Sequence, residues 1–137
     1  MVLIETDIIL ALSSRKDRHH SEAKEILERL SHAVLSPYTL AEIDLLVSSG
    51  TLKVKPVPYY NSLYRVLSYY KVTVLPPDPR HFSTAWELRE KYNLTFFDSL
   101  HAASAIVSGE VLVSYDKSYS NVEELDYIHP RDLLTKL

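Results

Sequence analysis

Acidic residues stand at positions in this sequence where apolar residues would be expected. Glu5 and Asp7 interrupt the apolar run MVLIETDIILAL, Asp98 is the only acid in FFDSLHAASAIVS, and Asp116 directly follows an apolar segment in VLVSYDKS. A carboxylate buried without a partner is strongly disfavoured, so such residues generally lie at a strand end, pair with a cation or bind a metal ion. With Glu42, these acids are the candidates for a chemical centre.

The residue types restrict the chemistry that such a centre can perform. Cysteine is absent, which excludes disulfides, zinc-cysteine clusters and thiol catalysis. The six histidines are scattered, and no two have the helical spacing typical of a zinc site. Clustered carboxylates without these ligands favour hard cations, so Mg²⁺ or Mn²⁺ is the expected cofactor.

Each acid also has a purely structural explanation. Asp98 and Glu42 each follow a threonine by three residues, which is the spacing of a helix capping box. Asp116 fits a turn, and the two N-terminal acids fit a solvated strand end and a helix-dipole partner. For any one acid alone the structural explanation is preferred. Four acids near one edge would repel one another without a cation, so together they favour a metal site.

Short apolar segments alternate with amphipathic helices along the chain. Strands are expected at 2–4, 33–35, 72–75, 111–113 and 127–128. Helices are expected from Thr6, as a cap, to about 12, and at 20–30, 37–50, 59–70, 80–91, 96–108 and 130–137. This alternation predicts an α/β fold with a doubly wound parallel sheet of about five strands, in the order 3-2-1-4-5, flanked by helices.

The predicted topology brings most of the acids together. Ligands of such sheets bind beyond the carboxyl ends of the strands, where the strand order reverses. Glu5 and Asp7 end the first strand, Asp116 follows the neighbouring fourth strand, and Glu42 lies in the helix after the second strand. The sequence does not decide at which end of the sheet Asp98 lies, because two helices intervene between the third and fourth strands.

The composition is that of a soluble globular protein. The 137 residues are 46% hydrophobic and 24% charged, and their length predicts a single domain over 1–137. The formal net charge of −3 argues against a uniformly basic nucleic-acid-binding protein. No apolar run is long enough to span a membrane, and no targeting signal precedes the first strand, so a cytoplasmic location is expected.

Three segments resemble the PIN-domain family of metal-dependent ribonucleases, in particular the VapC-type toxins of prokaryotic toxin-antitoxin pairs. They are LIETDIILAL, SPYTLAEI and LTFFDSLHAASAIVSGEVLVSYDKSYSNV, and the likeness covers nearly the whole chain. The resemblance implies a PIN-like fold, Mg²⁺- or Mn²⁺-dependent endonucleolytic cleavage of single-stranded RNA, and an antitoxin partner. It also implies that Asp98 lies in the acidic centre.

The resemblance assigns roles to individual positions. The catalytic acids fall on Glu5, Glu42, Asp98 and Asp116, and the expected metal ligands are Glu5, Asp7, Asp98 and Asp116, with Asp98 and Asp116 as first choices. Asp7 stands where asparagine or another polar residue is common. The family's first acid is ordinarily aspartate, and Glu5 extends the carboxylate by roughly 1.5 Å. His101 could brace Asp98 or touch a phosphate, although a packed helix position is preferred.

Two other functions compete with the nuclease. A phosphoacceptor receiver domain also gathers acids and Mg²⁺, but it needs an acid directly after the middle strand and a lysine after the last, and neither is present in the required place. A catalytically weakened PIN-fold module that binds RNA or protein is the alternative that Glu5 favours.

Surface residues suggest how partners bind. Arg15, Lys16, Arg18 and Lys117 are candidates for contacts with RNA phosphates, although an ordinary solvated surface explains them as well. The helix expected at 59–70 is rich in tyrosine and apolar on two faces. Such a helix must be covered on two sides, so we expect a homodimer that buries part of it.

Overall fold

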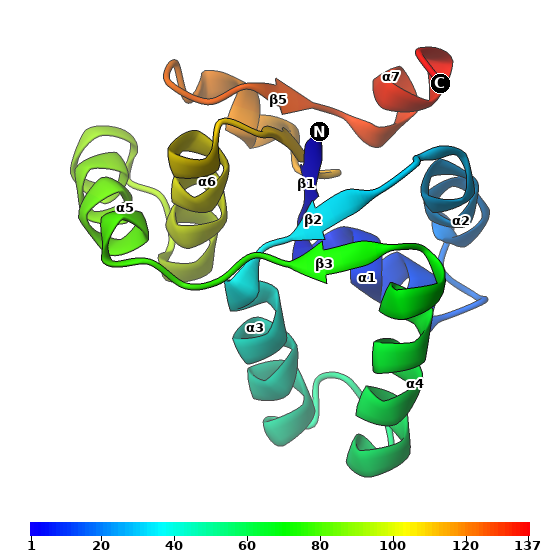
Figure 1. Ribbon diagram of the computed structural model, residues 1–137. Coiled ribbons are helices and arrows are strands. Elements are labelled where there is room, and N and C mark those ends of the chain that lie inside the picture. Colours follow the sequence, from blue (N-terminus) through cyan, green and yellow to red (C-terminus); the bar gives the residue numbers. More distant parts are fainter.

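A parallel sheet lies between two groups of helices in the computed structural model, which describes residues 1–137 (Figure 1). The sheet has the order β3-β2-β1-β4-β5, and every neighbouring pair is parallel, as predicted. The strands are β1 (Val2–Ile4), β2 (Ala33–Leu35), β3 (Val72–Val74), β4 (Val111–Val113) and β5 (Tyr127–Ile128).

Seven α-helices and one 3-10 helix connect the strands. They are α1 (Thr6–Ser13), α2 (His20–Arg29), α3 (Pro37–Ser48), α4 (Pro56–Tyr69), α5 (Pro79–Tyr92), α6 (Phe96–Ser108), η1 (Lys117–Asn121) and α7 (Pro130–Thr135). None of these helices is long and apolar enough to cross a membrane.

The strands are short and apolar because both faces of the sheet are covered. Ile4, Leu35 and Val113 pack with α1, α2 and α7 on one face, and their neighbours Leu3 and Leu112 pack with α5 and α6 on the other. This alternation follows from the two-residue period of a strand. Helix α6 is the most enclosed helix, because every residue from 99 to 105 is buried.

Local signals define most helix ends. Ser36 caps α3 by accepting a hydrogen bond from the Tyr38 N–H, and Pro37 follows at the first helical position. Asp78 caps α5 in the same way, ahead of Pro79. Gly109 ends α6 with a φ of +71°, a left-handed conformation that glycine adopts without strain.

The predicted bounds agree with the structure for four strands and for α6. The third strand ends at Val74, one residue early, and α3 and α7 end at Ser48 and Thr135, before their predicted last residues. The prediction that Thr6 caps α1 is wrong. Glu5 occupies the cap position without a side-chain cap bond, and Thr6 is the first residue of the helix, with its hydroxyl donating to Thr39.

Candidate metal centre

The residues that directly follow three neighbouring strands form the floor of a polar site. Glu5 follows β1, Ser36 follows β2 and Ser114 follows β4, and their exposed fractions are 6%, 0% and 0%. Backbone bonds continue the sheet past the strand ends, because the Glu5 N–H donates to Val113 O at 3.2 Å and the Ser36 N–H donates to Ile4 O at 3.4 Å. The sheet therefore fixes these side chains at its carboxyl edge.

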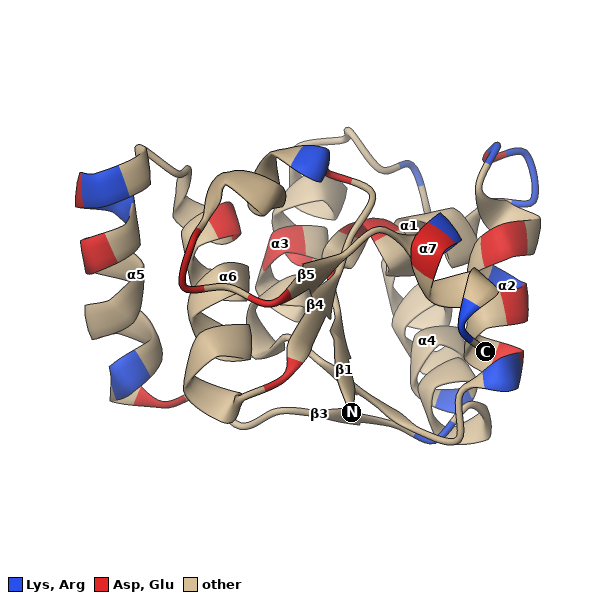
Figure 2. Ribbon diagram, turned by 90° about the horizontal axis from the view of Figure 1, so that it is seen from above, with Lys and Arg blue, Asp and Glu red and all other residues tan.

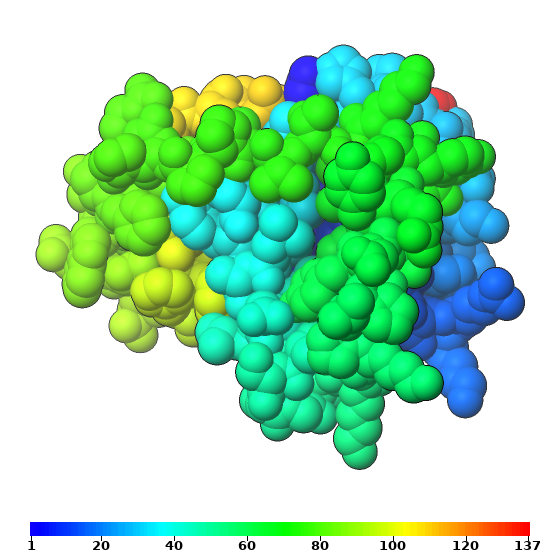
Figure 3. All heavy atoms as spheres, turned by 60° about the horizontal axis from the view of Figure 1, so that its bottom comes forward, coloured from blue at the N-terminus to red at the C-terminus, as the bar shows by residue number.

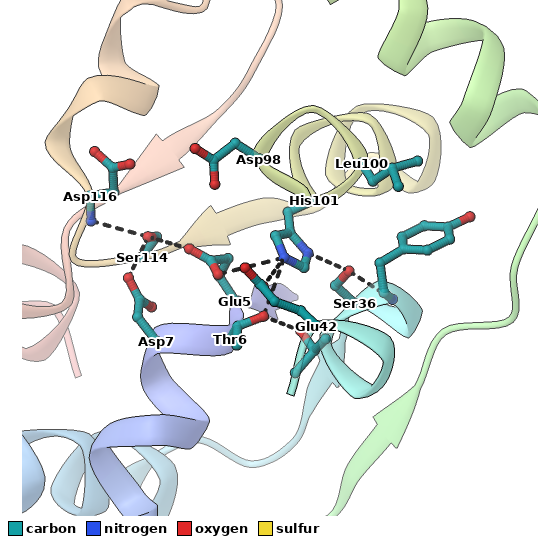
Figure 4. A network of polar contacts seen from close by, with 12 residues as sticks. Glu5, Thr6, Asp7, Ser36, Glu42, Asp98, Leu100, His101, Ser114 and Asp116 are labelled. Atoms are coloured by element: carbon teal, nitrogen blue, oxygen red, sulfur yellow. Dashed lines mark hydrogen bonds and ion pairs between the residues drawn. The ribbon is translucent and has the colours of Figure 1, made fainter. Parts of the chain in front are cut away.

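Ser114 links three of the predicted acids. Its Oγ lies 2.9 Å from Glu5 Oε2 and 2.7 Å from Asp7 Oδ2, and it accepts a bond from the Asp116 N–H at 3.1 Å (Figure 4). A serine hydroxyl has only one hydrogen to donate, so it cannot satisfy two ionised carboxylates at once. Asp7 receives a further bond from the Tyr115 N–H at 2.8 Å, but its buried Oδ1 has no hydrogen-bond partner.

Burial makes the two N-terminal acids hard to ionise together. Burial and the nearby charge of Asp7 raise the pKa of Glu5 to about 7. Burial also raises the pKa of Asp7, against the opposing effect of its hydrogen bonds from Ser114 and Tyr115. A divalent cation would relieve both effects, because it supplies the positive charge that the site lacks.

His101 connects α6 to the acids that follow β1 and β2. Its Nε2 lies 2.8 Å from Glu42 Oε1 and 3.6 Å from Glu5 Oε1, and its Nδ1 lies 2.7 Å from Ser36 Oγ (Figure 4). Thr6 Oγ1 is 3.2 Å from the same Nε2 and donates to Thr39 Oγ1 at 3.0 Å. His101 is fully buried, as a packed helix residue is, but it braces Glu42 and not Asp98.

Glu42 is more easily ionised than its neighbour Glu5. Burial acts to raise its pKa, but hydrogen bonding to His101 outweighs burial and lowers the pKa below its usual range. One ligand atom each from Glu5, Glu42 and His101 lie within 4.8 Å of one another, close enough to share one metal ion. The predicted capping box of Glu42 is absent, because Ser36 and not Thr39 caps α3.

Asp98 lies in the first turn of α6 and points toward the same site. Figure 4 shows its carboxylate between Asp116 and His101, on the side of Glu5 away from Thr6. The Tyr119 hydroxyl donates to Asp98 Oδ1 at 3.2 Å. Thr95 makes no side-chain cap bond, so the capping-box explanation also fails for Asp98.

Asp116 combines a structural role with a place at the rim. Its Oδ1 accepts bonds from the Ser118 N–H at 2.9 Å and from the Ser118 Oγ at 2.6 Å, which caps η1 as the turn interpretation predicts. Both bonds use the same oxygen, so Oδ2 is free to act as a ligand.

The structure thus gathers all five predicted acids at one edge, in two groups. In the first group, Glu5 and Glu42 contact His101, and Asp7 shares Ser114 with Glu5. In the second, Asp98 and Asp116 face them from α6 and from the segment after β4 (Figure 4). Ser36 and Thr6 hold His101, Thr39 holds Thr6, and Tyr119 holds Asp98, and none of these four residues carries a sequence pattern that singles it out.

The comparison with protein families decides the identity of the fold. The PIN-domain family model matches residues 2–125, which is most of the chain. The chain belongs to the PIN-domain family. No curated protein sequence matches this PIN domain significantly.

Solved structures with the same fold have low sequence identity. VapBC2 from Rickettsia felis, bound to a promoter DNA fragment, is 18% identical, with a TM-score of 0.71 over 94% of this PIN domain and 98% of that chain. VapBC-1 from nontypeable Haemophilus influenzae is 18% identical, with a TM-score of 0.71 and coverages of 96% and 99%. VapC20 from Mycobacterium tuberculosis, described as a toxin that cleaves the sarcin-ricin loop, is 18% identical, with a TM-score of 0.71 and coverages of 90% and 95%.

The residues of this PIN domain fit a hard divalent cation. The site offers carboxylate oxygens and one imidazole, without thiolates, and the buried Asp7 Oδ1 lacks a hydrogen-bond partner. Oxygen-rich ligand sets of this kind suit Mg²⁺ and Mn²⁺.

Proposed function

We propose that this PIN domain is a metal-dependent endoribonuclease that cleaves single-stranded RNA and acts in the cytoplasm as the toxin of a toxin-antitoxin pair. In this proposal residues 1–137 form a single domain. The observation that carries it is the gathering of five acids, Glu5, Asp7, Glu42, Asp98 and Asp116, at the carboxyl edge of a PIN-fold sheet.

Mg²⁺ or Mn²⁺ would be held by Asp98 and Asp116, with Glu5 and Asp7 completing the set. A bound divalent cation supplies a water of lowered pKa and neutralises charge that develops on the scissile phosphate. The chain's own groups position this set. Ser114 holds Glu5 and Asp7, and Tyr119 holds Asp98.

Glu42 is assigned a catalytic role beside this set. His101, fixed by Ser36 on its other nitrogen, holds the Glu42 carboxylate at 2.8 Å and keeps it ionised. An ionised carboxylate at this place can accept a proton from an attacking water, provided that the water lies within hydrogen-bond distance.

The related structures support the choice of substrate and partner. The Mycobacterium tuberculosis protein is described as cleaving RNA, and several of the others were solved as VapBC or toxin-antitoxin complexes. Single-stranded RNA is favoured because a compact acidic site at a sheet edge presents no element that fits a duplex groove.

Cleavage by the purified protein tests the proposal. Wild type should cut an internally labelled single-stranded RNA at internal positions in the presence of Mg²⁺ or Mn²⁺, and EDTA should stop the reaction. The dependence is expected because the acids repel a phosphodiester unless a cation is present. Failure on RNAs of varied sequence with both metals would refute nuclease activity of the natural protein.

One observation favours the second function, a PIN-fold module that binds RNA or protein without efficient cleavage. Both Glu5 oxygens face protein groups, with Ser114 at 2.9 Å and His101 at 3.6 Å. Its raised pKa makes Glu5 a weaker metal ligand at neutral pH than an ionised aspartate would be. If wild type does not cleave RNA whereas Glu5→Asp does, this second function is the correct one.

A homodimer is also part of the proposal, with α4 in the interface. Tyr64 and Tyr69 are 74% and 78% exposed on this helix. Figure 3 shows that α4, in green, lies beside α3, in teal. Tyr60 is less suited to an interface, because its hydroxyl donates to Asp44 of α3 at 2.7 Å. Exposed tyrosines on one helix favour association, since tyrosine is enriched at protein interfaces.

Light scattering tests the dimer. Wild type at micromolar concentration should have the mass of two chains, and Tyr64→Ala should shift the mass toward one chain because it removes an exposed apolar contact. The control is Phe82→Ala, which removes an exposed aromatic ring from α5. A monomeric wild type would exclude the dimer. A dimer that Tyr64→Ala leaves intact would place the dimer interface elsewhere on the protein.

A further inference from the structure

A basic pocket of about 440 Å³ lies next to the acidic centre. Its lining includes Arg18, His19, Tyr115, Lys117, His129 and Arg131. Glu22 is its one acidic residue, so three cations face one anion in a chain whose formal net charge is −3. Figure 2 shows that the loop before α2 and helix α7 both carry Lys and Arg positions. The sequence had suggested Arg18 and Lys117 for this role, but Arg15 and Lys16 do not line the pocket.

The pocket and the acidic centre share one backbone segment. The Tyr115 N–H donates to Asp7 Oδ2 at 2.8 Å, while the Tyr115 ring lines the pocket. The next residue is Asp116, and Lys117 after it lines the pocket. A polymer bound at the acidic centre would therefore pass beside the pocket.

The aromatic and imidazole rings give the pocket a fixed wall. The His19 ring stacks on Tyr115 with a centroid distance of 3.9 Å and an interplanar angle of 17°. The His129 ring meets the Tyr115 ring edge-on at 5.5 Å and 84°. The Nδ1 of His129 accepts a bond from the Arg131 N–H at 3.1 Å, so the hydrogen of a neutral His129 is on Nε2.

The three cations are free to bind a ligand. None of them takes part in an ion pair within the chain. Arg18 uses its Nε to donate to His19 at 3.1 Å, which leaves the two outer guanidinium nitrogens unengaged. Guanidinium and ammonium groups are the side chains that bind phosphates in proteins, and the first turn of α2 adds its partial positive charge.

We propose that this pocket binds a backbone phosphate of the single-stranded RNA next to the bond that is cut. The inference rests on the proposed function, because it takes RNA as the ligand. It explains how a site built from five acids holds a polyanion, since the pocket supplies the attraction that the acids do not.

The test measures RNA binding without cleavage. Fluorescence anisotropy with a fluorescein-labelled single-stranded RNA oligonucleotide, in EDTA, should show that Arg131→Gln and Lys117→Gln each raise the Kd by about tenfold. Each substitution should also make the salt dependence less steep, so that the fall of log K for binding with log salt concentration is smaller by about 0.7. Lys53→Gln, an exposed lysine between α3 and α4, is the matched control and should bind as wild type does.

Each outcome decides the inference. It is overturned if the pocket variants bind as tightly as Lys53→Gln, or if wild type shows no measurable binding. Both pocket side chains are exposed, and melting temperatures equal to that of wild type would confirm that the variants fold. Pocket-dependent binding by a wild type that never cleaves with Mg²⁺ or Mn²⁺ would refute the nuclease and uphold the pocket. Cleavage by a wild type whose RNA binding does not depend on the pocket would uphold the nuclease and refute the pocket.

Discussion

Asp116→Asn should slow RNA cleavage by at least about a hundredfold, because it removes a charge that a bound metal ion needs. It should also abolish most of the rise in melting temperature that Mg²⁺ or Mn²⁺ produces in wild type. The amide oxygen of asparagine can still accept both bonds from Ser118 that Asp116 Oδ1 accepts, so the cap of η1 is preserved. The loss is therefore one of chemistry and not of folding.

Two matched variants sharpen this result. Asp126→Asn makes the same change at an exposed site before β5, at the amino edge of the sheet, and should leave cleavage unchanged. Glu5→Asp keeps the charge and shortens the side chain, so cleavage should be retained and can even improve. An Asp116→Asn protein that cleaves normally, or whose melting temperature still rises with metal, would remove Asp116 from the ligand set.

The ionisation of Glu5 should lower the stability of the metal-free protein as the pH rises from about 4.5 to about 7. The pKa of Glu5 is raised from 4.5 to about 7 in the folded state, so the folded protein holds a proton that the unfolded chain releases. This contribution is complete below pH 4.5 and is lost as the pH passes 7, and it amounts to about 3 kcal/mol at most. Asp7 acts in the same direction, because its pKa is also raised.

Urea unfolding in EDTA at several pH values measures this dependence. Glu5→Gln should flatten it, whereas Glu87→Gln, an exposed change on α5, should not. The lowered pKa of Glu42 changes the stability only at pH values below about 4.5, so it does not mask the effect of Glu5 between pH 4.5 and 7. Mg²⁺ should restore stability at pH 7 and above, because it favours the ionised acids. An undiminished slope in Glu5→Gln would mean that another group holds the proton.

The sequence was enough to predict the sheet and most of the acidic centre. Apolar segments of three residues defined β1, β2 and β4, and the rule that ligands bind beyond parallel strand ends brought Glu5 and Asp116 together. That rule does not reach Asp98, since α5 and α6 pack together before the chain returns to the sheet. The family resemblance supplied its place.

The network that holds the acids was not predictable in this way. His101 meets Glu42 across 59 residues and Thr6 across 95, and such contacts depend on how α6 packs against α3 and on the rotamers of each side chain. The periodicity of α6 showed that His101 is buried, but not which acid it faces. Arg131 was missed for a similar reason, because only the path from β5 to α7 brings it beside Lys117.

The pairing of β1 with β4 also decides when the acidic centre comes into being during synthesis. β1 is made first among the strands, but its partner β4, which Ser114 directly follows, comes more than a hundred residues later. Until that segment has left the ribosome, Glu5 and Asp7 lack both Ser114, which bonds to each of them, and the nearby Asp116. A non-local pairing of this kind forms late, since closing a long loop is entropically unfavourable. Under the proposed function, a nascent chain therefore has no complete acidic centre with which to cut RNA until β1 and β4 have paired.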